Sequence, residues 1–155
     1  MAQRRVVARA DEVIGSFFGA QRAAATGTRQ GRVDRMEEDL RLFVEEHVEL
    51  VLDGPELALL ALERQFDAER AAARVAEAGA VLLLLPLFLE ESQWHGLDYE
   101  DRRLRLELAE PFAHEIARLP ELQDDDLGAA VWIVEATVRH AIWMLRQERE
   151  ATRRG

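Results

Sequence analysis

Four histidines offer the side chains best suited to metal binding or proton transfer. His47, His95, His114 and His140 fall in four different segments, and packed helices could bring several of them around one metal ion. None has a glutamate three residues before it, so the Glu-x-x-His spacing of di-iron carboxylate proteins is absent. Glu110 lies four residues before His114, which places both side chains on one helical face. We predict no bound metal or cofactor, and name Glu110, His114, His47 and His140 as the candidate ligands if one is bound.

The sequence lacks the usual motifs of nucleophilic and phosphate chemistry. It has no cysteine, which excludes disulfides, cysteine-ligated zinc and thiol catalysis. Ser16 and Ser92 are the only serines, and neither lies in a Gly-x-Ser-x-Gly motif. Gly15 and Gly19 lie within a helical pattern rather than in a phosphate-binding loop. An enzymatic function is therefore poorly supported.

His47 lies in the middle of an apolar stripe. Met36, Leu40, Phe43 and Leu50 share its helical face at steps of three or four residues. A histidine in that setting is more often a core residue with one hydrogen-bond partner than a ligand or a base. We expect His47 to be buried.

The last predicted helix carries an apolar arc that is too broad for a peripheral helix of a monomer. The arc consists of Leu127, Ala130, Val131, Val134, Ala141, Ile142 and Leu145. We expect this helix to be central in the fold or shared between two subunits.

A second stripe of the same helix consists of Trp132, Glu135, Arg139 and Trp143. Large aromatics and arginine are the residue types that anchor protein interfaces, and Glu135 and Arg139 have the spacing of a helical ion pair. In an antiparallel pairing of two copies, each of these charges could meet the opposite charge on the partner. The stripe predicts a homodimer interface. Cover by the N-terminal residues of the same chain is the alternative.

Helical periodicity extends along the sequence, and no alternating strand pattern interrupts it. It predicts an all-α fold, a single-domain helical bundle of five or six helices over residues 1–155. The expected helices span about 3–25, 34–52, 56–78, 81–89, 98–118 and 124–148. A buried strand is the alternative for 81–89.

Capping patterns suggest several of these boundaries. Asp34 followed by Glu37 resembles a capping box, and Asp53-Gly54-Pro55 ends one helix and starts the next. Three aspartates at 124–126 suit the N-terminus of the last helix, where negative charge interacts favourably with the helix dipole.

The third predicted helix has an apolar face that consists of Leu59, Leu62, Phe66 and Ala73.

Composition limits the classes of partner. The chain has 155 residues, 48% of them hydrophobic and 32% charged, and a net charge of −10. Six arginines against two acids make residues 1–32 basic, whereas 33–150 form an acidic helical body. The basic segment could dock on that body or on a partner, and an arginine-rich helix without such a role is the alternative.

Net acidity argues against nucleic acid as a partner. The longest apolar run, ten residues at 80–89, is too short to cross a membrane. The N-terminus shows no clean signal peptide, because Asp11 and Glu12 interrupt its apolar residues. We expect a cytoplasmic protein that binds neither nucleic acid nor membrane.

The stretch from Arg9 to Arg35, RADEVIGSFFGAQRAAATGTRQGRVDR, resembles the opening of short uncharacterised helical proteins of actinobacteria, a resemblance that implies no activity. Residues Met36 to Gln147 are loosely similar to the ligand-binding and dimerisation half of TetR-type repressors. Both are all-helical and end in a long apolar helix after an acidic start. The repressors' helix-turn-helix is missing, so direct DNA repression is not implied.

Two hypotheses follow for function. The first is a non-enzymatic helical module that forms a homodimer or binds another partner, with a small apolar ligand as a further candidate. The alternative is a metal- or cofactor-binding helical bundle with catalytic activity. The convergence of the histidine and glutamate side chains distinguishes the two.

Overall fold

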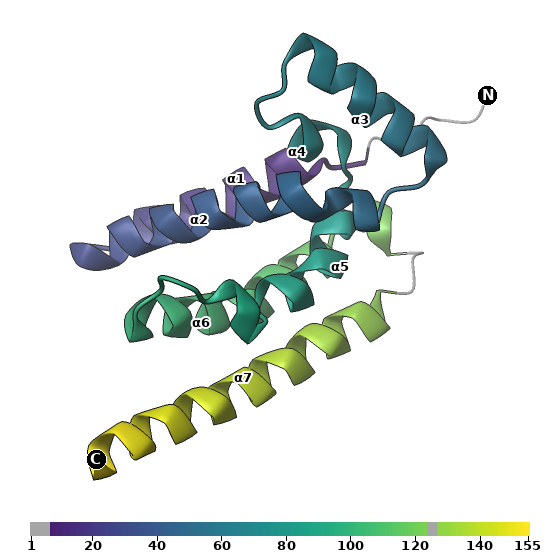
Figure 1. Ribbon diagram of the computed structural model, residues 1–155. Coiled ribbons are helices and arrows are strands. Elements are labelled where there is room, and N and C mark those ends of the chain that lie inside the picture. The colour runs from purple at the N-terminus through teal and green to yellow at the C-terminus, as the bar shows by residue number, and fades with distance from the viewer. Residues whose placement is uncertain (1–6, 124–126) are drawn as a thin grey trace.

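Helices form the regular structure of the computed structural model, which describes residues 7–123 and 127–155 (Figure 1). The α-helices in these ranges are α1 (Ala10–Ala24), α2 (Thr28–His47), α3 (Gly54–Phe66), α4 (Ala71–Val75), α5 (Ala78–Phe88), α6 (Tyr99–Ala117) and α7 (Gly128–Arg154). Short 3-10 helices lie between some of them: η1 (Val48–Leu50), η2 (Glu91–Gln93) and η3 (Pro120–Leu122). The all-α prediction is confirmed, but this part of the chain forms seven α-helices rather than five or six. The aspartates at 124–126 lie outside the described residues.

Aspartate caps start α3 and α6. The Asp53 carboxylate accepts a hydrogen bond from the Glu56 amide at 2.8 Å, and Glu56 accepts one from the Asp53 amide at 3.3 Å. Asp98 caps α6 by accepting from the Asp101 amide at 2.8 Å. That amide, together with the Arg32 guanidinium, holds the pKa of Asp98 below its ordinary value. Both helices therefore begin where the sequence predicted.

The start of α2 differs from the prediction. The helix begins at Thr28, so Asp34 lies inside it and is not an N-cap. The side chain of Arg22, on α1, forms ion pairs with both Asp34 and Glu37. These two carboxylates therefore connect two neighbouring helices, which is why a local capping pattern was misleading.

The predicted helix over 56–78 is interrupted after Phe66. The helical path ends at Asp67, whose backbone is extended, and Arg70, which has a left-handed conformation with φ of 57°, directly precedes the next helix. Arg74 stabilises the resulting turn, because its guanidinium donates to the Asp67 carbonyl at 2.7 Å and to the Glu63 carboxylate at 3.0 Å. The second part of the predicted helix becomes the short α4, which packs against α1, α2 and α3.

As a consequence, most of the apolar face predicted for the third helix does not pack. Leu59, Leu62 and Phe66 are 46%, 50% and 81% exposed, whereas Ala73, now on α4, is buried. Leu60, on another side of α3, is the buried residue of this helix.

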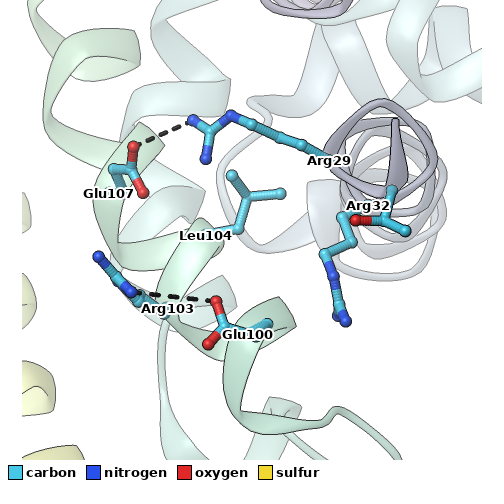
Figure 2. Close-up of a pocket in the computed structure, with 7 residues that line it drawn as sticks. Arg29, Arg32, Glu100, Arg103, Leu104 and Glu107 are labelled. Atoms are coloured by element: carbon cyan, nitrogen blue, oxygen red, sulfur yellow. Dashed lines mark hydrogen bonds and ion pairs between the residues drawn. The ribbon is translucent and has the colours of Figure 1, made fainter. Parts of the chain in front are cut away.

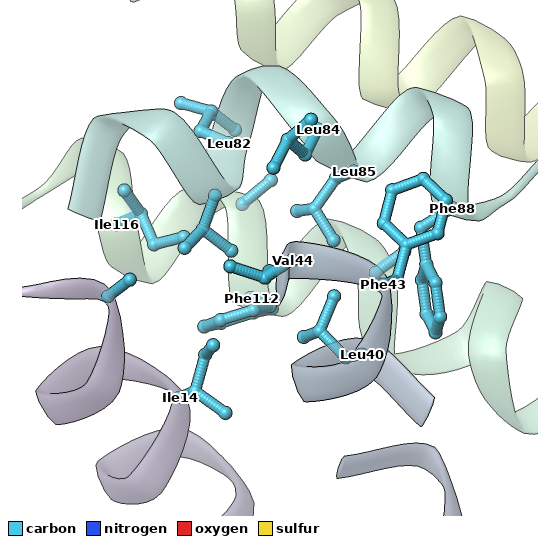
Figure 3. Packing of buried hydrophobic residues seen from close by; sticks show 14 of the residues in the cluster. Ile14, Leu40, Phe43, Val44, Leu82, Leu84, Leu85, Phe88, Phe112 and Ile116 are labelled. Carbon is cyan, nitrogen blue, oxygen red and sulfur yellow. The ribbon is translucent and has the colours of Figure 1, made fainter. Parts of the chain in front are cut away.

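The centre of the structure is α5. Its sequence is apolar on all sides, and it packs against α1, α2, α6 and α7. Figure 3 shows buried side chains of α5 meeting those of three neighbouring helices. The labelled residues are Leu82, Leu84, Leu85 and Phe88 of α5, Ile14 of α1, Leu40, Phe43 and Val44 of α2, and Phe112 and Ile116 of α6. The segment 81–88 is therefore helical and mostly buried, with Leu83 50% exposed, and the strand alternative is wrong.

The last helix lies at the edge of the structure. It packs against α5 and α6 along one side, and Figure 1 shows nothing of the described chain beyond it. Its buried residues are Ala130, Val134, Val138, Ala141 and Leu145. The predicted apolar arc does contact the core, but a central position for α7 within one chain is wrong.

Backbone hydrogen bonds join the residues before α1 to the connection between α4 and α5. The amide of Ala10 donates to the carbonyl of Ala76 at 2.8 Å, and the amide of Ala78 donates to the carbonyl of Ala8 at 2.9 Å. Nothing in the helical pattern predicted this link.

No helix in the described ranges combines the length and apolar character needed to span a bilayer.

Candidate functional site

The predicted core histidine is only half-buried. His47 is the last residue of α2, and its ring Nδ1 lies 3.0 Å from the carbonyl oxygen of Phe43. The imidazole stacks on the Phe43 ring with centroids 4.0 Å apart. The helix ends here, and Val48, which is fully buried, takes the core position that the stripe assigned to His47. The change from α2 to η1 also leaves Leu50 69% exposed.

The other candidate ligands are dispersed. His114, on α6, pairs through Nε2 with Glu135 of α7 at 3.1 Å, while Glu110 is half-buried one turn earlier. His140 is exposed on α7 and stacks on Trp143 with centroids 6.2 Å apart. Within residues 7–123 and 127–155, no three histidine, aspartate or glutamate side chains are placed to hold a metal ion. The arrangement therefore offers single pairs rather than a ligand set.

An arginine-rich hollow of about 400 Å³ lies between the start of α2 and the first half of α6 (Figure 2). Arg29 is 3.0 Å from the Glu107 carboxylate, and Arg103 is 4.0 Å from Glu100. Arg32 contacts Asp98 and Asp101 at 2.7 and 2.8 Å. Every arginine of the hollow thus faces a carboxylate, so the hollow has little spare positive charge for an anion. The pairs of Arg29 and Arg32 connect the basic N-terminal part to the acidic body within one chain.

The sequence did not reveal an ion pair between α2 and α6 in which the arginine is buried and the aspartate is partly exposed. Arg105 is 4% exposed, donates to Asp39 at 2.7 Å and to the Gln93 carbonyl at 3.1 Å, and lies 4.2 Å from the Phe88 ring centroid. Burial lowers the pKa of the Arg105 guanidinium, and the hydrogen bond to Asp39 opposes that shift. Since both ends of the guanidinium are engaged, we assign this pair to the structure of the protein rather than to substrate binding.

Two of the three tryptophans are exposed to solvent on the outward side of α7. Trp132 is 62% exposed and Trp143 is 59% exposed, whereas Trp94, before α6, is 5% exposed with the Arg102 guanidinium 5.7 Å from its ring centroid. Trp132 and Trp143 are eleven residues apart, so they align within about 20° on an ideal helix. Ile133 adds a further exposed apolar side chain at 46%.

The charges of this stripe are arranged differently from the prediction. Glu135 is half-buried and binds His114 of α6, and in the described part of the chain it forms no ion pair with Arg139. Arg139 is exposed between the two tryptophans. One Glu135 oxygen is engaged with His114, which leaves the other for a further donor.

The N-terminal helix does not cover the tryptophans. Helix α1 packs mainly against α2, α4 and α5, and its Phe17 ring also stacks on Phe112 of α6, while both indoles stay exposed in the described structure. Residues 1–6, the remainder of the predicted cover, lie outside the described residues.

A second hollow of about 400 Å³ lies beside Trp132. It is lined by Ala117, Leu122, Gln123, Leu127, Gly128, Val131, Trp132 and Glu135. Four of these, Gly128, Val131, Trp132 and Glu135, follow the i, i+3, i+4, i+7 spacing of a hole that accepts a side chain in helix packing. Its size also falls within the range of small-molecule sites, about 300–1,000 Å³. The residues can bind an apolar group, and they include no serine, threonine, histidine or lysine.

Comparisons with protein-family models, with curated proteins and with solved structures gave no match for this chain. The site must therefore be interpreted from its own geometry.

Proposed function

We propose that this chain is a non-catalytic helical module that associates with a second copy of itself through the outward side of α7. The exposure of Trp132 and Trp143 on one aligned stripe is the observation that carries this proposal.

The energetic argument rests on the area of the two indoles. Their exposed parts amount to on the order of 150 Å² each, and burying such an area is worth about 4 kcal/mol at 25 cal/mol per Å². Exposed apolar side chains that form one patch rimmed by polar residues are typical of interaction surfaces. Since α1 packs elsewhere, a second molecule is the source of that cover.

A second copy fits this stripe better than an unrelated protein does. A two-fold interface requires one surface that is complementary to itself. The stripe meets this condition, because a tryptophan lies at each end and Arg139 is the exposed charge between them, with Glu135 beside it.

The test is a comparison of self-association in matched variants. Sedimentation of the native protein at tens of micromolar should give a dimer. The double change Trp132→Ala and Trp143→Ala should give a monomer with nearly native helicity, because truncating a tryptophan that is a hot spot of an interface costs about 2 kcal/mol or more.

The control variant removes two exposed apolar residues from another helix. Leu62→Ala together with Phe66→Ala on α3 should leave the dimer unchanged. A monomeric native protein would contradict the proposal. So would a tryptophan double variant that unfolds, because the indoles would then belong to the fold of the single chain.

A further inference from the structure

The hollow beside Trp132 could accept a side chain of a partner helix, and the tryptophan stripe of α7 contains one of suitable size. Its four α7 residues are centred between Val131 and Trp132. Gly128 has no side chain, which opens one corner, and Ala117 and Leu122 contribute an apolar wall. The largest exposed side chain elsewhere on the same stripe is Trp143. An indole fits within the volume of about 400 Å³.

We infer that the partner's Trp143 enters this hollow, in an antiparallel pairing whose two-fold axis passes between Thr137 and Val138. The inference rests on the proposed self-association of α7 and assigns its register. In this register each residue faces the one equally distant from the axis on the other copy, so Trp132 faces the partner's Trp143. The symmetry fills both hollows at once, with one indole from each copy.

Charge favours the same orientation. The antiparallel register places Glu135 opposite the partner's His140 and one position from the partner's Arg139, so the free carboxylate oxygen meets a donor. In a parallel two-fold pairing, Arg139 of one copy would face Arg139 of the other, and the two hollows would also face each other. Like charges and two unfilled hollows would then oppose association.

The available area is consistent with a stable dimer. Helix α7 overlaps its partner over residues 128–147, a length of about 30 Å. The two tryptophans contribute on the order of 300 Å² per copy toward the roughly 800 Å² of a stable interface. Ile133 and the walls of the hollow contribute further area.

The absence of cysteine from the sequence allows the register to be measured by thiol cross-linking. Ala136 lies near the axis, so the Ala136→Cys variant should be joined to its own copy by a short bis-maleimide. The Ala129→Cys variant should not, because its two thiols would be about 25 Å apart along the helices. An equimolar mixture of Ala129→Cys and Arg146→Cys should form a cross-linked heterodimer, since these positions face each other.

A variant of the hollow tests its occupant directly. In Gly128→Leu, the new side chain would occupy the space of the partner's indole, and self-association should weaken by about tenfold or more. Gly128 is not among the glycines with positive φ, and leucine favours a helix more than glycine does. Loss of the dimer with native helicity would therefore reflect the hollow and not the fold.

The outcomes separate this inference from the proposed function. A dimer in which Ala129→Cys cross-links to its own copy, as Ala136→Cys does, has parallel helices. A dimer in which the mixed pair fails to cross-link has another register. Either result overturns the register while self-association stands. A Gly128→Leu variant that associates as tightly as the native protein overturns the occupied hollow. A native protein that sediments as a monomer overturns both proposals.

Discussion

At the scale of single residues, Arg105 is the clearest case of a role that a sequence pattern hides. Its neighbours Leu104 and Leu106 are both buried, and so is Arg105 itself. Its guanidinium remains charged because Asp39 and a backbone carbonyl accept its hydrogen bonds. Asp39 belongs to a helix 66 residues earlier, so no local spacing could indicate the pair.

The two members of this pair should respond differently to substitution. Asp39→Ala leaves a buried guanidinium without its counter-charge and should lower the free energy of unfolding by about 2–3 kcal/mol. Arg105→Met should cost about 1 kcal/mol, because methionine fills much of the space and the Asp39 side chain, 42% exposed, returns to water. Urea unfolding of both variants measures this difference. A larger loss for Arg105→Met would contradict the assignment.

At the scale of elements, local sequence patterns predicted helix positions correctly where no residue distant in the sequence affects them. The capped starts of α3 and α6 and the apolar helix containing Pro86 were all predicted correctly. The start of α2 was not, because Asp34 and Glu37 bind Arg22 of another helix. The interruption after Phe66 was also missed, since Arg74 stabilises that turn through side-chain contacts that periodicity does not contain.

The two aspartates of these patterns make a matched test of capping. Asp53→Ala removes a real N-cap and should cost α3 about 1 kcal/mol, so its amides should exchange about fivefold faster in hydrogen-exchange measurements. Asp34→Ala removes a partly exposed ion-pair partner from inside α2 and should change exchange in that helix much less. Equal changes in amide exchange in the two helices would show that the capping box at Asp53 stabilises α3 no more than the ion pair of Asp34 stabilises α2.

At the scale of the whole molecule, α5 occupies the centre while α3 and α7 lie at the edges. The tryptophan stripe of α7 could be predicted because it depends only on residue type and helical spacing within one element. The hollow beside Trp132 could not, because Ala117 and Leu122 reach it from α6 and η3. The prediction that the broad apolar arc packs against other helices was correct. The position of α7 at the edge depends on tertiary packing, which the periodicity of one helix does not specify.

The contrast between one buried and two exposed tryptophans gives the protein an internal optical reporter. Trp94 is already shielded, so its fluorescence should change little when two chains associate, whereas the emission of Trp132 and Trp143 should move to shorter wavelength as water leaves their rings. Dilution should therefore shift the emission of the native protein and of Trp94→Phe toward longer wavelength. The Trp132→Ala and Trp143→Ala double variant should show no dependence on concentration. A native spectrum that stays constant over a range in which sedimentation detects dissociation would place both indoles outside the contact, and the interface would then have to lie on another face of the molecule.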